Sequence, residues 1–254
     1  MSRYEDGLVS IVTPAWRAAG YVSDTIQGAL AQTYTNWELL VVDDCSPDDT
    51  CAVVARAAAA DPRVRLLRQS VNGGPANARN RALEEARGRF IAFCDSDDYW
   101  LPRKLELQLT FMQERSSAMS YTEFRRINES NSRIGARILV PESLGYHQLL
   151  KNTAIATSTV VLDRASIGDV RMTRTFYDDF VLWLSIMKRG FTAHGLREDL
   201  MRYRVVGNSW SRSKSRSAGM VWRTYREIEG LSWPYSAWCL ANYGMRALVK
   251  YARR

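Results

Sequence analysis

The sequence GRFIAFCDSDDYW, residues 88–100, joins a short apolar run to a cluster of acids. Residues 90–94 have the length and composition of a buried strand, and the acids follow it directly. Asp95 and Asp97 stand at positions i and i+2, so a turn can aim both carboxylates at one centre. Hard divalent cations such as Mg²⁺ or Mn²⁺ bind through such oxygens. A solvated turn that begins the next helix is the alternative, but the position after a strand favours a metal site.

Strands and helices alternate through the first half of the chain. Short apolar runs between turn-forming residues predict buried strands, and apolar residues spaced three or four apart predict amphipathic helices. The strands are expected at 8–12, 39–42, 64–67 and 90–94, and the helices at 22–30, 50–60, 75–86 and 101–112. This order predicts an α/β fold with a mainly parallel sheet that helices cover on both faces.

The second half of the chain is less regular. Residues 124–145 carry mixed charge and are expected to form a surface excursion, whereas 157–162 have the composition of a further strand. A later helix begins at Asp178-Asp179 and ends at 188–190. Its buried face is expected to consist of Phe180, Trp183, Leu184 and Met187. No repeat and no long linker divides the sequence into independent domains.

Polar residues gather where the predicted strands end. They occupy 14–17, 43–46, 72–75 and 95–98. The carboxyl ends of parallel strands meet at one edge of a sheet, and open α/β sheets bind ligands there. We therefore expect a ligand site at this edge.

Several side chains at this edge suit a nucleotide. Asp43 and Asp44 can accept hydrogen bonds from a base or from ribose hydroxyls, although a capping turn is the alternative. Trp16 can stack on a base, or pack in the core as a lone Trp more often does. Arg79 lies one turn into a helix that begins at the sheet edge, where the cation and the helix dipole both favour a pyrophosphate.

The composition excludes several classes of protein. With 46% hydrophobic and 24% charged residues, the chain is neither disordered nor collagen-like. His147 and His194 are far apart, which argues against a histidine-based zinc site and a Ser-His-Asp triad. The four cysteines form no CxxC pair, so a reducing, cytoplasmic compartment is expected. No signal peptide and no membrane-spanning run is evident, so we expect a soluble or peripheral protein.

Positive charge and tryptophan concentrate towards the end of the chain. The formal net charge is +8, and Trp210, Trp222, Trp233 and Trp238 are interleaved with Lys and Arg. This pattern fits an anionic membrane surface such as the inner face of the cell membrane. A solvated basic face beside an aromatic core, or a homodimer interface, are the alternatives. No recognition helix or zinc-finger spacing occurs, so a specific nucleic-acid partner is not expected.

Taken in order, four stretches resemble the family-2 glycosyltransferases, which have the GT-A nucleotide-sugar-binding fold. They are VSIVTPAW (9–16), QTYTNWELLVVDDCS (32–46), GGPANARNRAL (73–83) and GRFIAFCDSDDYWLP (88–102). The resemblance is weaker at DDFVLWL (178–184) and YRVV (203–206). It implies a GT-A catalytic domain over 1–205, with a nucleotide-sugar-binding half (8–112) and an acceptor-binding half (113–205). A basic, Trp-rich helical extension (206–254) follows.

The resemblance also implies a reaction and roles for residues. It places the nucleotide sugar, with UDP the expected nucleotide, on Pro14, Trp16, Asp43, Asp44, Arg79, Asp95 and Ser96. It places Mn²⁺ or Mg²⁺ on Asp95 and Asp97, and the general base on Asp179. The implied reaction is inverting transfer of one sugar to a glycan or lipid-linked acceptor, in the assembly of a surface polysaccharide. The Gln-x-x-Arg-Trp motif of processive synthases is absent, which agrees with transfer of one sugar per encounter.

The chain departs from the family pattern at a few positions. Arg17 replaces the usual Asn, Cys45 the usual Gly and Asp178 the usual Glu, and Val206 stands where a His is frequent. These departures support a second hypothesis, a nucleotide-sugar-binding or membrane-associated scaffold without transferase activity. Nucleotidyl transfer is the neighbouring enzyme class, and it would release pyrophosphate instead of a nucleoside diphosphate.

Overall fold

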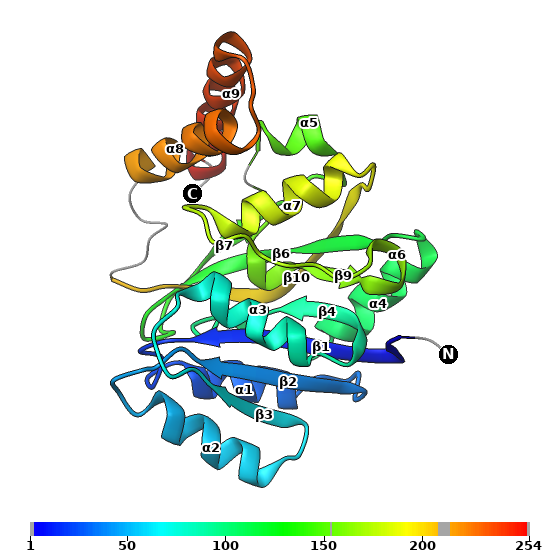
Figure 1. The fold of residues 1–254 in the computed structure, drawn as a ribbon, viewed down its shortest axis with the longest axis vertical. Coiled ribbons are helices and arrows are strands. Elements are labelled where there is room, and N and C mark those ends of the chain that lie inside the picture. Colours follow the sequence, from blue (N-terminus) through cyan, green and yellow to red (C-terminus); the bar gives the residue numbers. More distant parts are fainter. Residues whose placement is uncertain (1–2, 153, 208–213, 253–254) are drawn as a thin grey trace.

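The computed structural model describes residues 3–152, 154–207 and 214–252 (Figure 1). Within these residues, ten strands form one sheet with the order β3-β2-β1-β4-β9-β6-β10-β5, and β7 and β8 pair at the side with β6 and β10. The strands are β1 (Glu5–Ala15), β2 (Trp37–Asp43), β3 (Val64–Arg68), β4 (Gly88–Phe93), β5 (Tyr99–Trp100), β6 (Met119–Asn128), β7 (Ile134–Ile138), β8 (Ser143–Leu144), β9 (Val161–Asp163) and β10 (Ala193–Val205).

The first four long strands run parallel, and the short strand β9 joins them to the second half of the sheet. β1 lies between β2 and β4, and β2 also pairs with β3, all in parallel. β9 is antiparallel to both β4 and β6, whereas β6 and β10 are parallel to each other. The sheet is therefore mixed but mainly parallel, as the alternation of predicted strands and helices indicated.

Helices cover both faces of the sheet, because alternate side chains of each strand point to opposite sides. Val12 and Leu40 pack with helices α3 (Pro75–Glu85) and α7 (Asp178–Lys188). Their neighbours Ile11 and Leu39 pack on the other face. The helices of that face are α1 (Val22–Leu30), α2 (Thr50–Ala60) and α4 (Lys104–Glu114). The predicted two-sided α/β arrangement is confirmed.

The second half of the chain differs from the sequence predictions in three places. The strand expected from residue 157 begins later, because Thr157–Thr159 forms a 3₁₀ turn, η1, in which the Thr159 N–H and hydroxyl both donate to the Ala156 carbonyl. The surface excursion of 124–145 contains the end of β6 and also β7 and β8. The thirteen-residue strand β10 was not predicted, since its charged residues hide the alternation of a strand.

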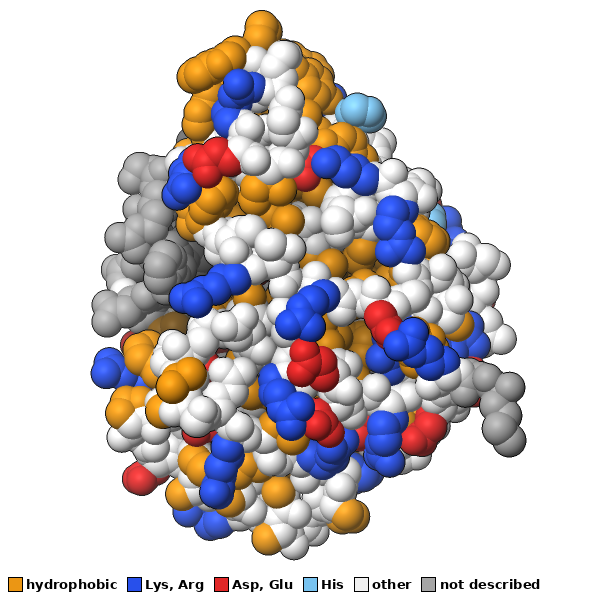
Figure 2. All heavy atoms as spheres, viewed as in Figure 1, with side chains coloured by type: hydrophobic (Ala, Val, Ile, Leu, Met, Phe, Trp, Pro, Cys, Tyr) orange, Lys and Arg blue, Asp and Glu red, His pale blue; other side chains and the backbone are white. Residues whose placement is uncertain are grey.

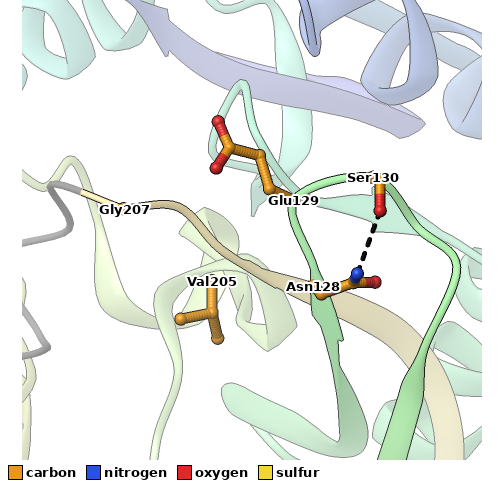
Figure 3. Close-up of a pocket in the computed structure, with 5 residues that line it drawn as sticks. All are labelled: Asn128, Glu129, Ser130, Val205 and Gly207. Carbon is orange, nitrogen blue, oxygen red and sulfur yellow. Dashed lines mark hydrogen bonds between the residues drawn. The ribbon is translucent and has the colours of Figure 1, made fainter.

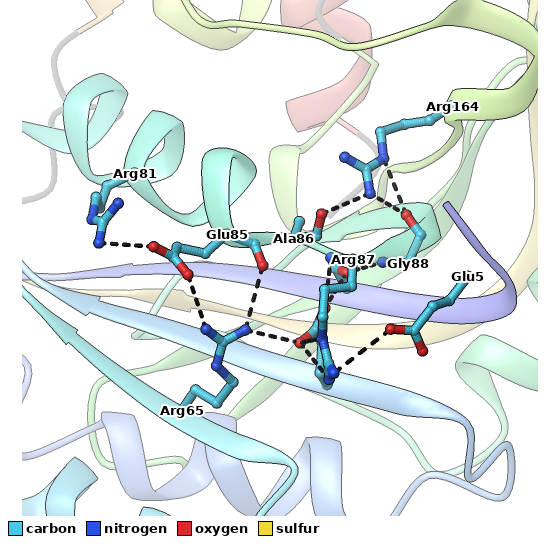
Figure 4. A network of polar contacts seen from close by, with 10 residues as sticks. Glu5, Arg65, Arg81, Glu85, Ala86, Arg87, Gly88 and Arg164 are labelled. Atoms are coloured by element: carbon cyan, nitrogen blue, oxygen red, sulfur yellow. Dashed lines mark hydrogen bonds and ion pairs between the residues drawn. The ribbon is translucent and has the colours of Figure 1, made fainter. Parts of the chain in front are cut away.

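Polar contacts of the buried Glu38 and Arg164 join the amino ends of the parallel strands, away from the predicted ligand edge. The Glu38 carboxylate accepts hydrogen bonds from the Ser10 hydroxyl at 2.7 Å and from the Arg87 N–H at 2.9 Å, and it pairs with Arg65 at 3.2 Å. Arg164 donates to the carbonyl groups of residues 86 and 88 (Figure 4). These contacts fix the connection between α3 and β4. They therefore help to hold the strands in register, and with them the strand ends at the opposite edge of the sheet.

The end of the chain forms helices that lie next to α7, on its side away from the sheet (Figure 1). It comprises α8 (Lys214–Arg223), a π-helical turn (Thr224–Ile228) and α9 (Trp233–Ala252). Val221, Tyr225 and Cys239 belong to the same core cluster as Trp183 of α7. The Tyr225 hydroxyl donates to the carbonyl of residue 150, just after α5 (Tyr146–Leu149). The predicted helical extension is thus present. Trp210 lies outside the described residues.

Candidate active site

The predicted site residues of the first half meet at the carboxyl ends of β1, β2 and β4. Pro14 lies in β1, Asp43 is the last residue of β2, and Asp95 follows β4 after one residue. The Asp44 N–H donates to the Ala15 carbonyl at 2.9 Å, so the first two turns are joined. These residues therefore lie together at the edge of the sheet where the sequence predicts a ligand site.

Two residues that depart from the family pattern have the backbone conformation that the usual residues adopt easily. Arg17 has φ of 53° and Cys45 has φ of 58°, in the left-handed region that favours Asn and Gly. The Arg17 N–H donates to the Ser46 hydroxyl at 3.2 Å. The backbone of both turns thus keeps the conformation for which Asn and Gly are suited, although the side chains have changed.

Trp16 does not pack in the core. It is 49% exposed, and the Arg17 guanidinium lies 4.6 Å from the centre of its ring. The alternative of core packing is therefore excluded. An exposed ring beside the strand ends can stack on a nucleobase.

Asp43 and Asp44 are both buried but have different partners. The two oxygens of Asp44 accept the N–H groups of Gly73 and Gly74, each at 2.8 Å. Asp44 therefore anchors the glycine loop that precedes α3. In Asp43, Oδ2 accepts a long hydrogen bond of 3.4 Å from the Ser46 N–H, and Oδ1 is buried without a protein partner. A buried acceptor without a partner is costly, so Asp43 suits a ligand N–H or hydroxyl.

Arg79 lies among the acids of the site. Its side chain is buried in α3, and one guanidinium nitrogen is 2.5 Å from Asp95 Oδ1. Burial lowers the pKa of Arg79, but the charges of Asp95, Asp179 and Asp178 outweigh it and hold this pKa above its ordinary value. Its Nε is buried without a protein partner. Arg79 is therefore a fixed cation that retains a hydrogen-bond donor for a ligand.

The acidic loop after β4 is held by the last of its acids. Asp98 is buried, and it accepts hydrogen bonds from the Ser158 hydroxyl at 2.6 Å and from the Arg204 N–H at 2.9 Å. Arg204 also donates to the Asp97 carbonyl at 2.9 Å. Burial, together with the nearby charge of Asp95, raises the pKa of Asp97 to about 6. Asp98 and Arg204 thus fix the loop and keep the other acids close together. Ser96 lies partly exposed in the same loop.

Asp179 stands in the first turn of α7. Its Oδ2 accepts the Thr157 hydroxyl, and its Oδ1 accepts the N–H of Phe180 at 2.7 Å. Its neighbour Asp178 instead accepts the Thr175 N–H at 2.7 Å. Asp179 also lines a small apolar pocket with Leu149, Ile155, Tyr177, Phe180 and Trp183. A carboxylate at the rim of such a pocket can receive a proton from a bound hydroxyl.

The η1 turn connects the two groups of acids, and sequence reasoning missed it. Thr157 contacts Asp179, whereas the Ser158 hydroxyl contacts Asp98 and also accepts the Asp95 N–H at 3.0 Å. The Trp100 indole donates to the Ser158 carbonyl at 2.7 Å and holds the turn from below. The run of three hydroxyl residues at 157–159 could have indicated a turn, because Ser and Thr side chains form hydrogen bonds with nearby backbone groups that compete with strand formation.

A second hollow lies beside the Arg204 contact with the acidic loop. It is an open depression of about 630 Å³ lined by Asn128, Glu129, Ser130, Val205 and Gly207 (Figure 3). A guanidinium nitrogen of Arg204 donates to the Glu129 carbonyl at 2.8 Å. The Tyr-Arg segment that resembles the family thus forms one wall of this depression.

The acids after β4 fit a divalent cation of the kind that binds with phosphates. No cluster of three or more His, Cys, Asp or Glu side chains suited to a metal occurs in the part of the chain that the structure describes. Mg²⁺ in nucleotide sites needs only one or two carboxylates, because phosphates and water complete its coordination. Burial is the main cause of the raised pKa of Asp97, and repulsion by the charge of Asp95 adds to it. A cation would relieve this repulsion, so the donor set fits Mg²⁺ or Mn²⁺.

The parallel strands of the first half, the acids at their ends and the acidic start of α7 are the features that resemble a family of sugar-transferring enzymes. The family model described as "Glycosyl transferase family 2" matches residues 10–171, and the chain belongs to this family. It is a family-2 glycosyltransferase, as the sequence motifs predicted.

Two relatives are similar over most of their length. The chain is 43% identical over 245 residues to a Bacillus subtilis (strain 168) protein named "Putative teichuronic acid biosynthesis glycosyltransferase TuaG", covering 96% of this chain and 97% of that protein. It is 39% identical over 219 residues to WfgD of Escherichia coli, covering 86% of this chain and 85% of the relative. WfgD is named a UDP-Glc:alpha-D-GlcNAc-diphosphoundecaprenol beta-1,3-glucosyltransferase.

Solved structures agree with the fold. S. aureus TarS 1-349 in complex with UDP-GlcNAc matches with a TM-score of 0.71 and 19% identity, over 92% of this chain and 71% of that one. The mannosyltransferase PcManGT from Pyrobaculum calidifontis, in complex with GDP-Man and Mn²⁺, matches with a TM-score of 0.68 and 17% identity, over 96% and 75%. At these identities the likeness concerns the fold, and the predicted GT-A fold is confirmed.

Proposed function

We propose that the chain transfers one sugar from a UDP-sugar to a lipid-diphosphate-linked glycan, with inversion, during assembly of a cell-surface polysaccharide. The names of TuaG and WfgD support the pathway class and the lipid-linked acceptor. The TarS complex with UDP-GlcNAc supports UDP as the nucleotide. Because the lipid part of such an acceptor lies in a bilayer, we place the enzyme as a peripheral protein on the cytoplasmic face of the cell membrane.

The observation that carries this proposal is the position of Arg79. The guanidinium is buried 2.5 Å from Asp95, and the charge of Asp179 also acts on it. It therefore joins the predicted metal loop to the predicted base. Negative charge develops on the diphosphate as it leaves, and both Arg79 and the start of α3 stabilise such charge. When bound at Asp95 and Asp97, Mn²⁺ or Mg²⁺ supplies further charge neutralisation at the phosphates.

Asp179 is suited to prepare the acceptor for attack. The Thr157 hydroxyl and the Phe180 N–H orient its carboxylate at the edge of the apolar pocket. In the proposed reaction an acceptor hydroxyl gives its proton to Asp179, and its oxygen attacks the anomeric carbon as the bond to the diphosphate breaks. One base and no enzymic nucleophile make this a single displacement, which inverts the configuration.

The turns after β1 and β2 are suited to bind the nucleoside. The buried Oδ1 of Asp43 can accept an N–H of the base or a ribose hydroxyl, and Trp16 can stack on the base beside Pro14. Asp44 contributes indirectly, because it holds the glycine loop at the start of α3. Ser96, within the acidic loop, stays a predicted contact of the nucleotide sugar.

The test compares Asp179→Asn with Asp178→Asn as a matched neighbouring control. UDP release is measured with Mn²⁺, a UDP-sugar and a short-chain polyprenyl diphosphate acceptor, and NMR gives the anomeric configuration of the product. We expect Asp179→Asn to lower turnover by about 10² to 10⁴. Asp178→Asn should retain most of the activity, since the Asn side chain still accepts the Thr175 N–H. Near-full turnover in Asp179→Asn would show that the base is assigned wrongly.

Two product measurements separate this proposal from its alternatives. Release of pyrophosphate in place of UDP would indicate nucleotidyl transfer. Absence of both transfer and sugar-nucleotide hydrolysis, with Mn²⁺ and folded protein, would favour a non-catalytic scaffold.

A further inference from the structure

Helix α9 exposes an apolar stripe on one side. Trp233, Trp238 and Met245 are 65%, 50% and 66% exposed. Exposed residues 234, 237, 238, 241 and 245 recur with helical spacing and therefore share one side of the helix. We call Trp233, Pro234, Ala237, Trp238, Ala241 and Met245 the α9 apolar face. Figure 2 shows apolar side chains gathered over this end of the molecule.

The α9 apolar face is not needed to hold the helix in place. The other side of α9 supplies Ser236 and Cys239, which are buried, and Cys239 belongs to the core cluster. Single exposed apolar residues are common, but a continuous patch marks an interaction surface. The sequence carries no acid between 230 and 254. This end of the chain therefore lacks the acidic side chains that would repel an anionic surface.

Cations surround this face. The Lys151 ammonium lies 4.0 Å from the centre of the Trp238 ring, and the Arg226 guanidinium lies 4.8 Å from that of Trp233. Arg246 is exposed next to Met245. Tryptophan beside cations is the composition of helices that lie in the headgroup region of anionic membranes. A protein partner of this chain's own charge would be repelled, whereas anionic phospholipid is attracted.

The geometry allows a helix that lies on a membrane but not one that crosses it. Of the described helices, none has both the length and the apolar content needed to cross a bilayer. A twenty-residue helix with one apolar side instead suits the plane of the interface.

The segment that precedes α9 contacts both ends of α7, the helix that carries Asp179. The Arg223 guanidinium of α8 lies 4.0 Å from the ring centre of Phe176, two residues before α7 begins. At the other end of α7, Lys188 pairs with Glu229 at 2.6 Å. Contacts at both ends of α7 thus fix the face relative to Asp179.

We propose that the α9 apolar face docks in the headgroup region of an anionic phospholipid bilayer, with the surrounding cations on the lipid phosphates. This inference rests on the proposed function in one respect, because a lipid-linked acceptor would then be met where α7 presents Asp179. The docking itself depends only on the composition and exposure of α9.

The test is flotation of the full chain with vesicles of phosphatidylcholine, alone or with phosphatidylglycerol. We expect binding to the anionic vesicles that weakens with salt. Trp238→Glu should lower the partition coefficient at least tenfold, and Lys151→Gln about fivefold, the effect of one cation near an anionic surface. Leu139→Glu is the matched control, because Leu139 is 60% exposed in the loop between β7 and β8 and this change should not affect binding.

Two outcomes would overturn the docking proposal. One is equal recovery of Trp238→Glu and Leu139→Glu with anionic vesicles. The other is a stable dimer in sedimentation that Trp238→Glu dissociates, because a second copy would then cover the face. Turnover of a water-soluble acceptor analogue is measured in parallel. Normal flotation without any transfer would count against the proposed function alone, and transfer without flotation would count against docking alone.

Discussion

Replacing Asp97 with asparagine is expected to stabilise the metal-free protein at neutral pH while removing its response to metal. Burial and the charge of Asp95 raise the pKa of Asp97 from 3.8 to about 6. At about 1.4 kcal/mol per pKa unit, the ionised side chain costs the folded metal-free protein at most about 3 kcal/mol. Water at the rim of the site screens part of this cost. Asparagine has the same shape and no charge, so it avoids the cost.

The sign of the pH dependence follows from the raised pKa. Below pH 3.8 the carboxyl is neutral in both folded and unfolded protein, so wild type and Asp97→Asn should differ little. As the pH rises from 3.8 to about 6, the wild type progressively loses the stability that the neutral form contributed, and above that range the loss is complete. The advantage of Asp97→Asn should therefore be greatest at pH 7.5 and roughly half as large at pH 5.

Urea unfolding with EDTA at pH 5 and pH 7.5 measures this difference. Asp61→Asn is a control in which stability should change in the opposite direction, because the hydrogen bond between Asp61 and Arg63 lowers the pKa of Asp61 in the wild type. That variant should lose stability at pH 7.5 relative to wild type. Mn²⁺ with UDP should raise the melting temperature of wild type more than that of Asp97→Asn. An Asp97→Asn variant that is no more stable than wild type at pH 7.5 would refute the reasoning.

Two further predictions concern the turns around the site. Cys45→Gly should raise the free energy of unfolding by about 0.5 to 1 kcal/mol. A left-handed conformation costs a non-glycine residue about 1 to 2 kcal/mol, and glycine avoids this cost. The greater entropy of glycine in the unfolded chain cancels part of the gain. Cys51→Gly in α2 is the matched control, and it should lower the free energy of unfolding by about 0.5 to 1 kcal/mol in the same urea titration. Equal effects of the two changes would show that the left-handed conformation of Cys45 carries no such cost. Thr157→Val removes the hydroxyl that orients Asp179 and should lower kcat about tenfold, the effect of about 1.4 kcal/mol, with little change in KM for the donor. Thr157→Ser keeps the hydroxyl and should restore most of kcat, so a Ser variant as slow as the Val variant would exclude a positioning role.

Much of the nucleotide-binding half could be predicted from the sequence. The runs that became β1 to β4 are local, and the acids that end them stand at fixed offsets from those runs. Because parallel strands end at one edge, the gathering of Pro14, Asp43 and Asp95 followed from periodicity alone. The left-handed turns at Arg17 and Cys45 could not be read in this way, since both residues disfavour that conformation.

The second half could be predicted much less well. The charged residues of β10 conceal its alternation, and its pairing with β6 joins segments far apart in the chain. The hydroxyl groups of Thr157 and Ser158 in η1 bond to Asp179 and to Asp98, which lie far from η1 in the sequence. Local pattern cannot supply such partners, because each of these hydrogen bonds depends on a contact made elsewhere.

By itself, the sequence determined the α/β class, the family and the places where acids follow strands, because these depend on short-range periodicity and on ordered motifs. Only the tertiary structure decided how each polar side chain is used: Asp44 anchors a loop, Asp43 keeps an acceptor without a protein partner, and Arg79 is buried beside Asp95. It also decided which side of α9 is left in contact with water. The physical reason is that burial and hydrogen-bond partners arise from the packing of distant segments, which no local stretch of residues contains.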